Sequence, residues 1–251
     1  MKTAVITGVS KGLGASIAKL LIEQGISVIG IARTENAELE TLAERHQVSY
    51  RYIACDLSNL QQVEEVFHLL REQVFGASTE VMLINNAAMV DPINTAGSYQ
   101  ISELTEHVAV NLTAPMITTN LFVEKATESK IDLIVVNVTS GAAGRSVSGW
   151  SAYCSTKAGI NRFTETVALE QADAGTLNKV ILFDPSIMDT DMQGSIRASS
   201  AEAFKDVATF QQYQQDNSLR DTEVVAKTLV ELLVDQAKII NGEIYSVKEL
   251  L

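Results

Sequence analysis

Tyr153 and Lys157 form the pair of residues in this sequence whose types and spacing most clearly permit chemistry. They stand four positions apart in a segment, 151–174, with helical spacing, so both side chains lie on one helix face a turn apart. A free phenol titrates near pKa ~10, but an ammonium about 4 Å away stabilises the phenolate by roughly 4 kcal/mol at an effective dielectric of about 20. A tyrosine placed in this way can exchange protons at physiological pH.

A tyrosine and a lysine at this spacing also occur as a plain surface pair, so the surrounding residues decide between the two interpretations. Ser140 follows the strand-like run Asp132–Val138 and precedes Tyr153 by thirteen residues. Its hydroxyl is therefore expected at the carboxyl end of that strand. Asn111 adds a side-chain amide after another helical segment. These four residues are the predicted catalytic group.

A glycine-rich turn follows the first strand-like run, Thr3–Thr7, and precedes a helical pattern. Glycines allow the backbone to turn tightly and to approach a pyrophosphate at the positive end of a helix. The alternative is a glycine turn needed only for close packing. The predicted cofactor residues of this turn are Gly8, Ser10, Lys11, Gly12, Leu13 and Gly14.

The second strand-like run ends in Ile31-Ala32-Arg33-Thr34 and has no carboxylate at its end. In dinucleotide folds an acidic residue at this place binds the ribose hydroxyls of NAD, whereas an arginine accommodates the 2′-phosphate of NADP. Arg33 and Lys11 could hold that phosphate by charge-assisted hydrogen bonds, so NADPH/NADP+ is the predicted cofactor. Two alternatives stay open: Arg33 and Lys11 are merely solvated, or Glu35 competes for the ribose.

A repeated alternation of strand and helix patterns must position these groups. The strand-like runs are nearly all apolar instead of alternating, as expected for strands buried on both faces of a parallel sheet. We predict a single α/β domain, 1–251, with a Rossmann-type doubly wound parallel sheet of about seven strands and helices on both faces. The runs are Thr3–Thr7, Ser27–Ala32, Tyr50–Ala54, Val81–Ile84, Asp132–Val138, Lys179–Phe183 and Glu243–Val247.

Two helix boundaries and one interruption can be placed from local signals. Ser58, with Gln61 three residues later, forms a capping-box pattern at a helix start, and Gly25 marks a helix end. Residues 189–220 break the alternation with serines and a glutamine-rich piece. An irregular or mobile substrate flap is expected there.

Composition excludes several classes of protein. With 46% hydrophobic and 20% charged residues the chain is typical of a packed globule. The formal charge of −12 disfavours nucleic acid and anionic membranes as partners, although a local basic pocket can still bind a small anion. Two cysteines, no signal peptide and no long apolar segment predict a cytoplasmic protein without a metal site. His46, His68 and His107 lack metal-ligand spacing and are expected in solvated or packing roles.

Together the motifs resemble the ordered motif set of the short-chain dehydrogenase/reductase family over nearly the entire chain. The set comprises Thr7-Gly8-x-x-x-Gly12-x-Gly14, Asn85-Asn86-Ala87-Ala88, Asn111, Ser140 and Tyr153-x-x-x-Lys157. The resemblance implies that Tyr153 donates a proton to a carbonyl oxygen to which Ser140 hydrogen-bonds. It also implies that Lys157 holds the nicotinamide ribose and lowers the tyrosine pKa, and that Asn111 supports a water relay.

The resemblance further implies the surroundings of the cofactor and an assembly. Cys55, Asp56 and Leu57 are expected to flank the adenine, Asn86 to line a ribose, and the segment 185–190, with Pro185, Ile187 and Thr190, to close over the nicotinamide. Self-association as a dimer or tetramer is expected through the long helices that carry the Asn111 and Tyr153 regions.

Two departures from the family pattern stand near the expected nicotinamide site. Ala88 replaces a usual glycine, and Asp184-Pro185-Ser186 replaces the common Pro-Gly after the sixth strand. Both could alter loop conformation, but neither removes a reacting group.

The run 185–193 and the segment Gly149-Trp150-Ser151-Ala152-Tyr153-Cys154 resemble the sepiapterin reductase branch and its bacterial benzil reductase relatives. This implies a small carbonyl substrate, often a vicinal dicarbonyl. In pterin-reducing members an acidic residue in the last strand anchors the pterin, and Tyr245 is placed there, so a diketone is favoured over a pterin. Trp150, Met188 and Met192 are expected as apolar pocket walls, with core or flap packing as the alternative.

Other functions remain open at this point. Within the family, the alternatives are a pterin reductase of the sepiapterin type and a 3-oxoacyl or alcohol dehydrogenase. A different class is a non-catalytic NADP(H) sensor, against which the intact serine, tyrosine and lysine argue.

Overall fold

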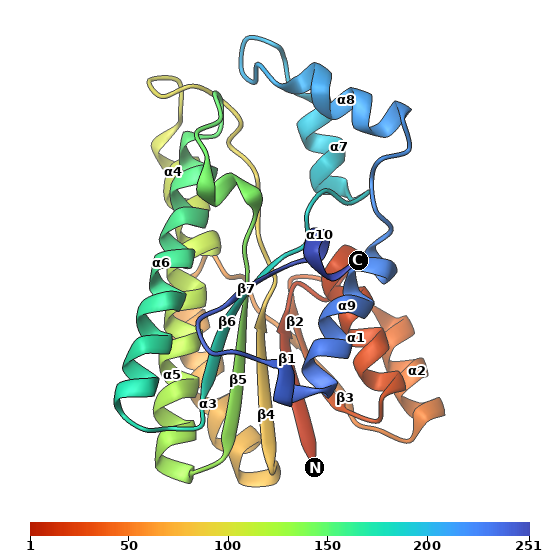
Figure 1. The fold of residues 1–251 in the computed structure, drawn as a ribbon, viewed down its shortest axis with the longest axis vertical. Helices are drawn as coiled ribbons and strands as arrows, with labels where there is room; N and C mark the ends of the chain where they lie inside the picture. The colour runs from red at the N-terminus through yellow and green to blue at the C-terminus, as the bar shows by residue number, and fades with distance from the viewer.

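A central β-sheet organises the protein in the computed structural model, which describes residues 1–251. Its seven strands have the order β3-β2-β1-β4-β5-β6-β7, and every neighbouring pair is parallel. The predicted doubly wound parallel sheet is therefore confirmed (Figure 1). The strands are β1 (Lys2–Thr7), β2 (Ser27–Ala32), β3 (Tyr50–Ala54), β4 (Glu80–Asn85), β5 (Asp132–Val138), β6 (Lys179–Asp184) and β7 (Ile244–Ser246).

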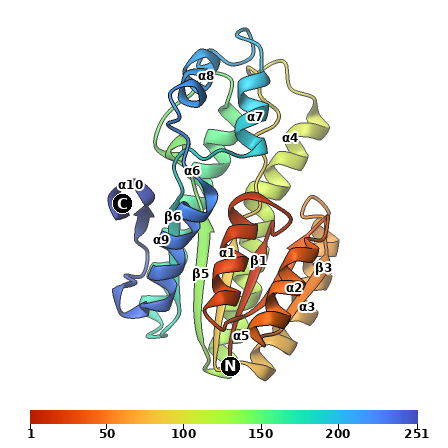
Figure 2. The same cartoon turned by 90° about the vertical axis from the view of Figure 1, so that its right-hand side faces the viewer.

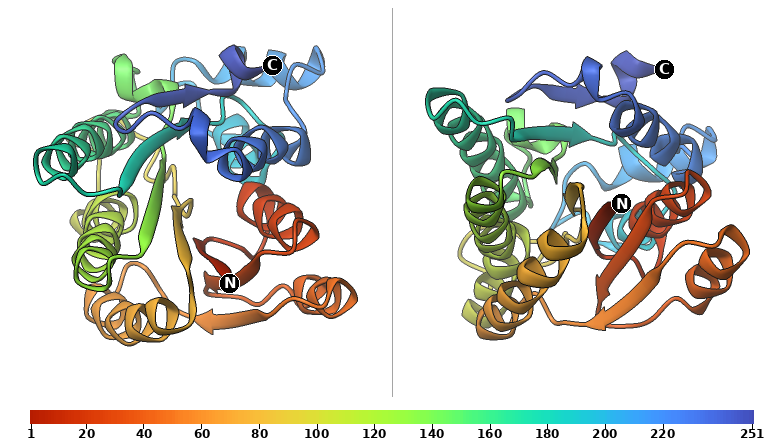
Figure 3. Two further views of the ribbon diagram at one scale, coloured as in Figure 1. Left: turned by 60° about the horizontal axis from the view of Figure 1, so that its bottom comes forward. Right: turned by 90° about the horizontal axis from the view of Figure 1, so that it is seen from below.

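Helices cover both faces of this sheet, as Figure 3 shows from below. One face carries α1 (Gly12–Glu23), α2 (Ala37–His46) and α9 (Thr222–Val234). The other carries α3 (Leu60–Ala77), α5 (Ala114–Ser129) and α6 (Ser151–Asp173). The remaining helical segments are α4 (Ile101–Val108), the π-helical turn η1 (Ala109–Thr113), the 3₁₀ turns η2 (Gly141–Gly144) and η3 (Gln236–Lys238), and α7 (Asp191–Ala198), α8 (Val207–Gln215) and α10 (Val247–Leu250).

The two apolar cores explain why the strand sequences do not alternate between polar and apolar residues. In β4, Met82 and Ile84 pack into the core beneath α1 and α9, whereas Val81 and Leu83 pack into the core beneath α3 and α5. Successive side chains of a strand point to opposite faces, so a strand covered on both faces must be apolar throughout.

The carboxyl ends of the strands gather the predicted motifs at one edge of the sheet. The glycine turn follows β1, Asn86 follows β4, Ser140 follows β5, and the segment 185–190 follows β6. Helices α7 and α8 stand beyond this edge, at the top of Figure 2.

The segment 189–220, predicted to be irregular, contains these two helices. Thr190 caps α7 by accepting a hydrogen bond from the Gln193 N–H, and Phe204 and Phe210 are buried. Apolar burial of these aromatic side chains outweighs the weak helical pattern of the serine- and glutamine-rich sequence.

Local boundary signals had mixed outcomes. Gly25 follows α1 with a φ of 75°, which confirms the predicted helix end. The capping box was wrong: Asn59 caps α3 by accepting from the Gln62 N–H, while Ser58 donates to the Asp56 carboxylate instead.

None of the helices combines the length and hydrophobicity needed to cross a membrane.

Candidate active site

Tyr153 and Lys157 lie on the first turns of α6, where both side chains are buried. The Lys157 Nζ atom lies 5.8 Å from the centre of the Tyr153 ring and donates a hydrogen bond to the Val138 carbonyl oxygen at 2.9 Å. Helix α6 thus holds the pair against the carboxyl end of β5. The predicted juxtaposition of phenol and ammonium exists in the fold.

The pKa values of this pair differ from the sequence-based expectation of a lowered tyrosine pKa. Burial raises the pKa of Tyr153 to about 12, and the nearby Ser140 hydroxyl only partly opposes this effect. Burial lowers the pKa of Lys157 to about 8, while the Asp184 carboxylate acts in the opposite direction. Desolvation disfavours both charged forms, and the ammonium is bonded to Val138 rather than to the phenol. Tyr153 is therefore held protonated.

Ser140 stands between the end of β5 and the 3₁₀ turn η2. Its hydroxyl oxygen accepts a hydrogen bond from the Ala142 N–H at 3.2 Å, which fixes the side chain as the cap of η2. The Ser140 hydroxyl is close enough to the Tyr153 phenol to lower the pKa of that phenol, so the two hydroxyls lie near each other. Two hydroxyls in this arrangement can address one carbonyl oxygen.

Asn111 lies in the π-helical turn η1, and its side chain is almost fully buried. Its Oδ1 atom accepts from the Met89 N–H at 2.9 Å, and its Nδ2 atom donates to the Met89 carbonyl at 2.7 Å. The amide therefore ties η1 to the segment that follows β4. Such π-helical turns within longer helices frequently occur at functional sites.

The departure at Asp184-Pro185-Ser186 has a structural consequence. Ser186 adopts a φ of 60°, a conformation that favours glycine. Its N–H donates to the Asp184 carboxylate at 2.9 Å, and Arg220 donates to its hydroxyl at 3.3 Å. The aspartate and the arginine thus hold a loop conformation that a glycine would adopt without strain.

The glycine turn is closed against the end of β4 so tightly that side chains cannot be accommodated. A Cβ atom on Gly14 would overlap the Gly8 carbonyl oxygen, and one on Gly8 would lie 2.9 Å from Asn86 Nδ2. Asn86 Nδ2 donates to the Thr7 carbonyl at 2.9 Å. The Asn86 amide therefore braces the turn, in addition to its expected place beside a cofactor ribose.

The donors around the start of α1 fit a pyrophosphate. Lys11 is the N-cap residue, and no side chain caps the first N–H groups of the helix. Gly12 has a φ of 60°, and a Cβ there would meet only a methyl of Thr190. Uncapped N–H groups beside a lysine form an anion-binding site of the kind that dinucleotide folds use. Leu13 is buried in the core, so only its backbone can face this site.

Lys11 also forms an exposed ion pair with Asp191 at the start of α7. The glycine turn and the segment after β6 therefore lie next to each other. Within that segment Pro185 is buried, Ile187 accepts a backbone hydrogen bond from Arg220, and Thr190 caps α7. The structure thus brings the predicted residues Pro185, Ile187 and Thr190 to the same edge as the turn.

Arg33 is exposed after the end of β2, close to Asp56 after the end of β3. Hydrogen bonds from Ser58 hold the pKa of the Asp56 carboxyl below its usual range, and the Arg33 charge contributes to this effect. Cys55 and Leu57 point into the core between the sheet and α3. Of this group, Arg33 and Asp56 present polar side chains at the strand ends.

Comparison with known proteins accounts for this arrangement. A sequence model of the short chain dehydrogenase family matches residues 2–201. The chain belongs to the short-chain dehydrogenase/reductase family. It is therefore an oxidoreductase that acts on CH–OH or C=O groups with a nicotinamide cofactor.

Relatives within the short-chain dehydrogenases/reductases include proteins of the predicted branch. Identity is 39% to a benzil reductase ((S)-benzoin forming) of Bacillus subtilis (strain 168), with 100% of both chains covered. It is 35% to a protein of the same name from Bacillus cereus, covering 99% of this chain and 100% of the relative. A sepiapterin reductase of Xenopus tropicalis is 28% identical over 91% of this chain and 90% of its own. The crystal structure of YIR035C, a short chain dehydrogenase/reductase from Saccharomyces cerevisiae, superimposes with a TM-score of 0.82 at 25% identity, covering 98% of this chain and 96% of that one.

An aromatic cluster lies beside Tyr153 in this short-chain dehydrogenase/reductase. The Trp150 ring stacks on Phe204 at 4.7 Å and meets the Tyr153 ring edge-on at 5.4 Å. Phe210 packs edge-on against both Trp150 and Phe204, and Met192 contacts the same cluster. Trp150 and Met192 thus lie on the Tyr153 side of the fold, where Trp150 is buried in the cluster; their role as pocket walls stays a prediction. Phe204 and Phe210 were missed, because nothing in the spacing of a serine- and glutamine-rich segment connects them to Tyr153.

Met188 and Tyr245 are placed elsewhere. Met188 packs against the core beneath α1 and α9. The Tyr245 hydroxyl donates to the Lys238 carbonyl at 3.0 Å and accepts from the Ile240 N–H at 2.7 Å. The loop 236–242 contacts the amino end of β6, opposite the site edge. The prediction of Tyr245 as a pocket residue was wrong, because its phenol bridges this loop instead.

His107 has a more specific environment than the solvated or packing role predicted for all three histidines. His46 and His68 are exposed, whereas His107 is fully buried and hydrogen-bonds to Asn111. The spacing of four residues between His107 and Asn111 on one helix was the available signal.

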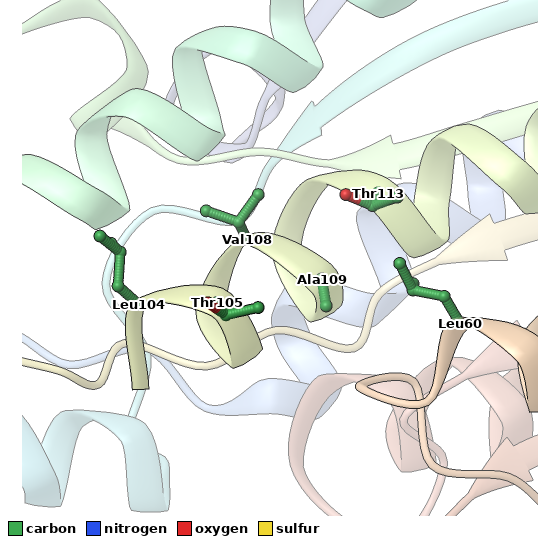
Figure 4. A pocket seen from close by; sticks show the side chains of 6 residues that line it. All are labelled: Leu60, Leu104, Thr105, Val108, Ala109 and Thr113. Atoms are coloured by element: carbon green, nitrogen blue, oxygen red, sulfur yellow. The ribbon is translucent and has the colours of Figure 1, made fainter. Parts of the chain in front are cut away.

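Two further features lie outside the site. An apolar hollow of about 310 Å³ on the outer side of α4 and η1 is lined by Leu60, Leu104, Thr105, Val108, Ala109 and Thr113 (Figure 4). None of the predicted site residues lines it.

No group of three or more His, Cys, Asp or Glu side chains is arranged to hold a metal ion.

Proposed function

We propose that the protein is an NADPH-dependent carbonyl reductase that reduces one carbonyl of a vicinal diketone, benzil-like in its aromatic substituents. The single observation that carries this proposal is the cluster of Trp150, Phe204 and Phe210 packed beside Tyr153. The three rings are buried against one another (Trp150 4%, Phe204 0% and Phe210 5% exposed), so they back an apolar region beside the phenol, which favours an apolar, aromatic substrate over a charged one. The names of the Bacillus relatives support the same substrate class.

The residues of the chain supply the proton and its surroundings. Tyr153 is protonated at neutral pH, since burial raises its pKa to about 12, and it can therefore act as the proton donor to the carbonyl oxygen. Ser140 lies beside the phenol and can donate a second hydrogen bond to the same oxygen. Lys157, buried below the phenol, supplies the positive charge that stabilises a phenolate after the proton has left.

NADPH is the proposed cofactor, held by the residues around the glycine turn. The open N-terminus of α1 and Lys11 would bind the pyrophosphate, and Arg33 would bind the 2′-phosphate. When bound, the nicotinamide supplies the hydride that reduces the carbonyl carbon. Lys157 would hold the nicotinamide ribose, and the 185–190 segment would cover the ring.

The proposal is tested by following the loss of NADPH or NADH absorbance with purified protein and a panel of carbonyl compounds. The panel contains benzil, a pterin diketone, an aldehyde and an acetoacetyl thioester. Faster NADPH oxidation with benzil than with the other compounds is expected. Faster turnover of the pterin would instead support a pterin reductase, and faster turnover of the thioester would support a 3-oxoacyl reductase.

A Tyr153→Phe variant separates an enzyme from a sensor. The phenol is the proposed proton donor, so turnover should fall by about 10²–10⁴-fold while NADPH binding, followed by quenching of Trp150 fluorescence, persists. Tight NADPH binding by the wild type without turnover of any compound would support a non-catalytic NADP(H) sensor instead.

A further inference from the structure

His107 is a buried histidine beside the candidate catalytic group to which neither the chemistry above nor any motif assigns a role. It lies on the last turn of α4, is 0% exposed, and its ring meets the Tyr153 ring edge-on at 6.1 Å. Helices α4 and α6 run side by side here (Figures 1 and 2). A histidine enclosed in this way needs a defined hydrogen-bond partner for each ring nitrogen.

The partners of His107 fix its tautomer. The Nδ1 atom lies 2.6 Å from the Asp91 carbonyl oxygen, which can only accept, so Nδ1 must carry the proton. The Nε2 atom lies 3.0 Å from Asn111 Nδ2, which can only donate, so Nε2 must accept. The Asn111 amide cannot flip to relieve this requirement, because its Oδ1 already accepts from the Met89 N–H.

His107 also reaches α6 directly. Its Nε2 atom lies 3.1 Å from the hydroxyl of Thr156, the residue before Lys157. The Thr156 hydroxyl in turn lies within hydrogen-bond distance of the Ala152 and Tyr153 carbonyls. One imidazole therefore connects three segments: the loop after β4, the π-helical turn with Asn111, and the turn of α6 that carries the phenol and the ammonium.

We propose that His107 is a positioning residue of the active site, which holds Asn111 and the start of α6 in place only as a neutral imidazole protonated on Nδ1. Adding a proton to Nε2 would make two donors, Nε2–H and Asn111 Nδ2–H, face each other in a buried site. The contact would then be repulsive, and η1 would have to shift. Protonation of His107 should therefore lower the activity in acid, although His107 is not proposed to contact the substrate.

The charges around His107 oppose its protonation. Burial holds the pKa of His107 below its ordinary value, and Lys157 on α6 contributes in the same direction. The Asp91 carbonyl, the Ala152 carbonyl on α6 and the Asp91 carboxylate act in the opposite direction but do not reverse the shift. Tyr153 faces the ring as an uncharged phenol, and Glu103 and Glu106 are exposed on α4 itself. The decline is thus expected below the ordinary titration range of histidine.

Two substitutions separate positioning from simple packing. In His107→Gln the amide oxygen can accept from Asn111 but cannot be protonated in this pH range, so kcat should stay within about threefold of wild type and the acid decline should disappear. In His107→Phe the ring volume stays but the acceptor is lost, so kcat should fall at least tenfold with little change in KM. His68→Gln and His68→Phe, on the exposed face of α3, are the matched controls.

A measurement without turnover keeps this inference separate from the proposed function, on which its kinetic arm rests. With three histidines in the chain, ¹⁵N ring spectra can resolve each imidazole. We expect His107 as the Nδ1–H tautomer, with an Asn111 side-chain amide signal that moves when His107 is replaced by Phe. An Nε2–H tautomer, protonation of the His107 ring without any movement of the Asn111 signal, or an Asn111 signal that stays in place when His107 is replaced by Phe would overturn the proposal even if the diketone reaction failed. Retention of the acid decline in His107→Gln would do the same where turnover is observed.

Discussion

The ammonium of Lys157 donates its hydrogen bond to the Val138 carbonyl and not to the phenol of Tyr153, whose ring centre lies 5.8 Å away. Both groups are buried, so each is driven toward its neutral form, with the pKa of Lys157 lowered to about 8 and that of Tyr153 raised to about 12. The fold therefore bears an energetic cost to place a lysine beside the tyrosine. That cost can be measured.

Substitution of Lys157 by Met should stabilise the protein at pH 7 by about 2 kcal/mol while it abolishes most of the activity. In the unfolded chain Lys157 has a pKa of ~10.4, whereas in the folded chain its pKa is about 8. Between about pH 8 and 10 the unfolded state therefore binds more protons, so the stability of the wild type rises with pH in this range. The loss of the hydrogen bond to Val138 offsets about 1 kcal/mol of the gain. Urea unfolding at pH 7 and pH 10 should show the advantage of the variant at pH 7 and its disappearance at pH 10.

The exposed Lys227 on α9 provides the control for that substitution. Lys227→Met removes the same charge from the surface and should change stability by less than about 0.5 kcal/mol at either pH. Equal effects of the two substitutions would mean that burial of Lys157 carries no energetic penalty.

Replacement of Gly149 by Ala should push the segment before α8 away from Trp150. Gly149 has a φ of 93°, and a Cβ there would overlap the Ala203 carbonyl oxygen. Gly97 has a φ of 101° with no atom within 4 Å of the corresponding Cβ, so Gly97→Ala shares the backbone strain without the collision. We expect Gly149→Ala to lower kcat/KM for benzil at least tenfold and to speed proteolysis within 199–206, with little effect of Gly97→Ala on either. Equal effects of Gly149→Ala and Gly97→Ala would mean that the close approach of Gly149 to Ala203 does not affect the site.

Replacement of Ser186 by Gly should stabilise the protein. The backbone at Ser186 has a φ of 60°, and a left-handed conformation costs a non-glycine residue roughly 1–2 kcal/mol. Loss of the hydrogen bond from Arg220 to the serine hydroxyl reduces the gain to about 0.5–1 kcal/mol. Thermal unfolding should register an increase in Tm, and Lys130→Gly, at a φ of 56° after α5, should give a comparable increase. A lower Tm for Ser186→Gly alone would mean that the contact with Arg220 outweighs the strain.

Replacement of Arg33 by Asp should shift the cofactor preference from NADPH to NADH. An aspartate would repel the 2′-phosphate and accept hydrogen bonds from the ribose hydroxyls. The ratio of kcat/KM for NADPH to that for NADH should fall by about 10²-fold or more, as expected when an attractive charge contact becomes a repulsive one. Arg162→Asp, an equal change of charge at an exposed site on α6, should leave the ratio unchanged. An unchanged ratio in Arg33→Asp would mean that Lys11 or another group, and not Arg33, recognises the 2′-phosphate.

The sequence by itself determined the sheet, because strands covered on both faces must be apolar and helices between parallel strands must be amphipathic. The runs predicted at Ser27–Ala32, Tyr50–Ala54 and Asp132–Val138 coincide with β2, β3 and β5. The order of motifs along the chain likewise predicted that the glycine turn, Ser140 and the segment after β6 share one edge.

Only the tertiary structure decided which side chains complete the site and what their charges are. Phe204 and Phe210 reach Trp150, and His107 reaches Thr156, through packing between segments whose separation in sequence carries no signal. Tyr245 turns away for the same reason, since its phenol bonds a loop beside a different strand end. Proton affinity follows burial and contacts in three dimensions, so the spacing of Tyr153 and Lys157 predicted their proximity, whereas the lowered tyrosine pKa inferred from that spacing was wrong.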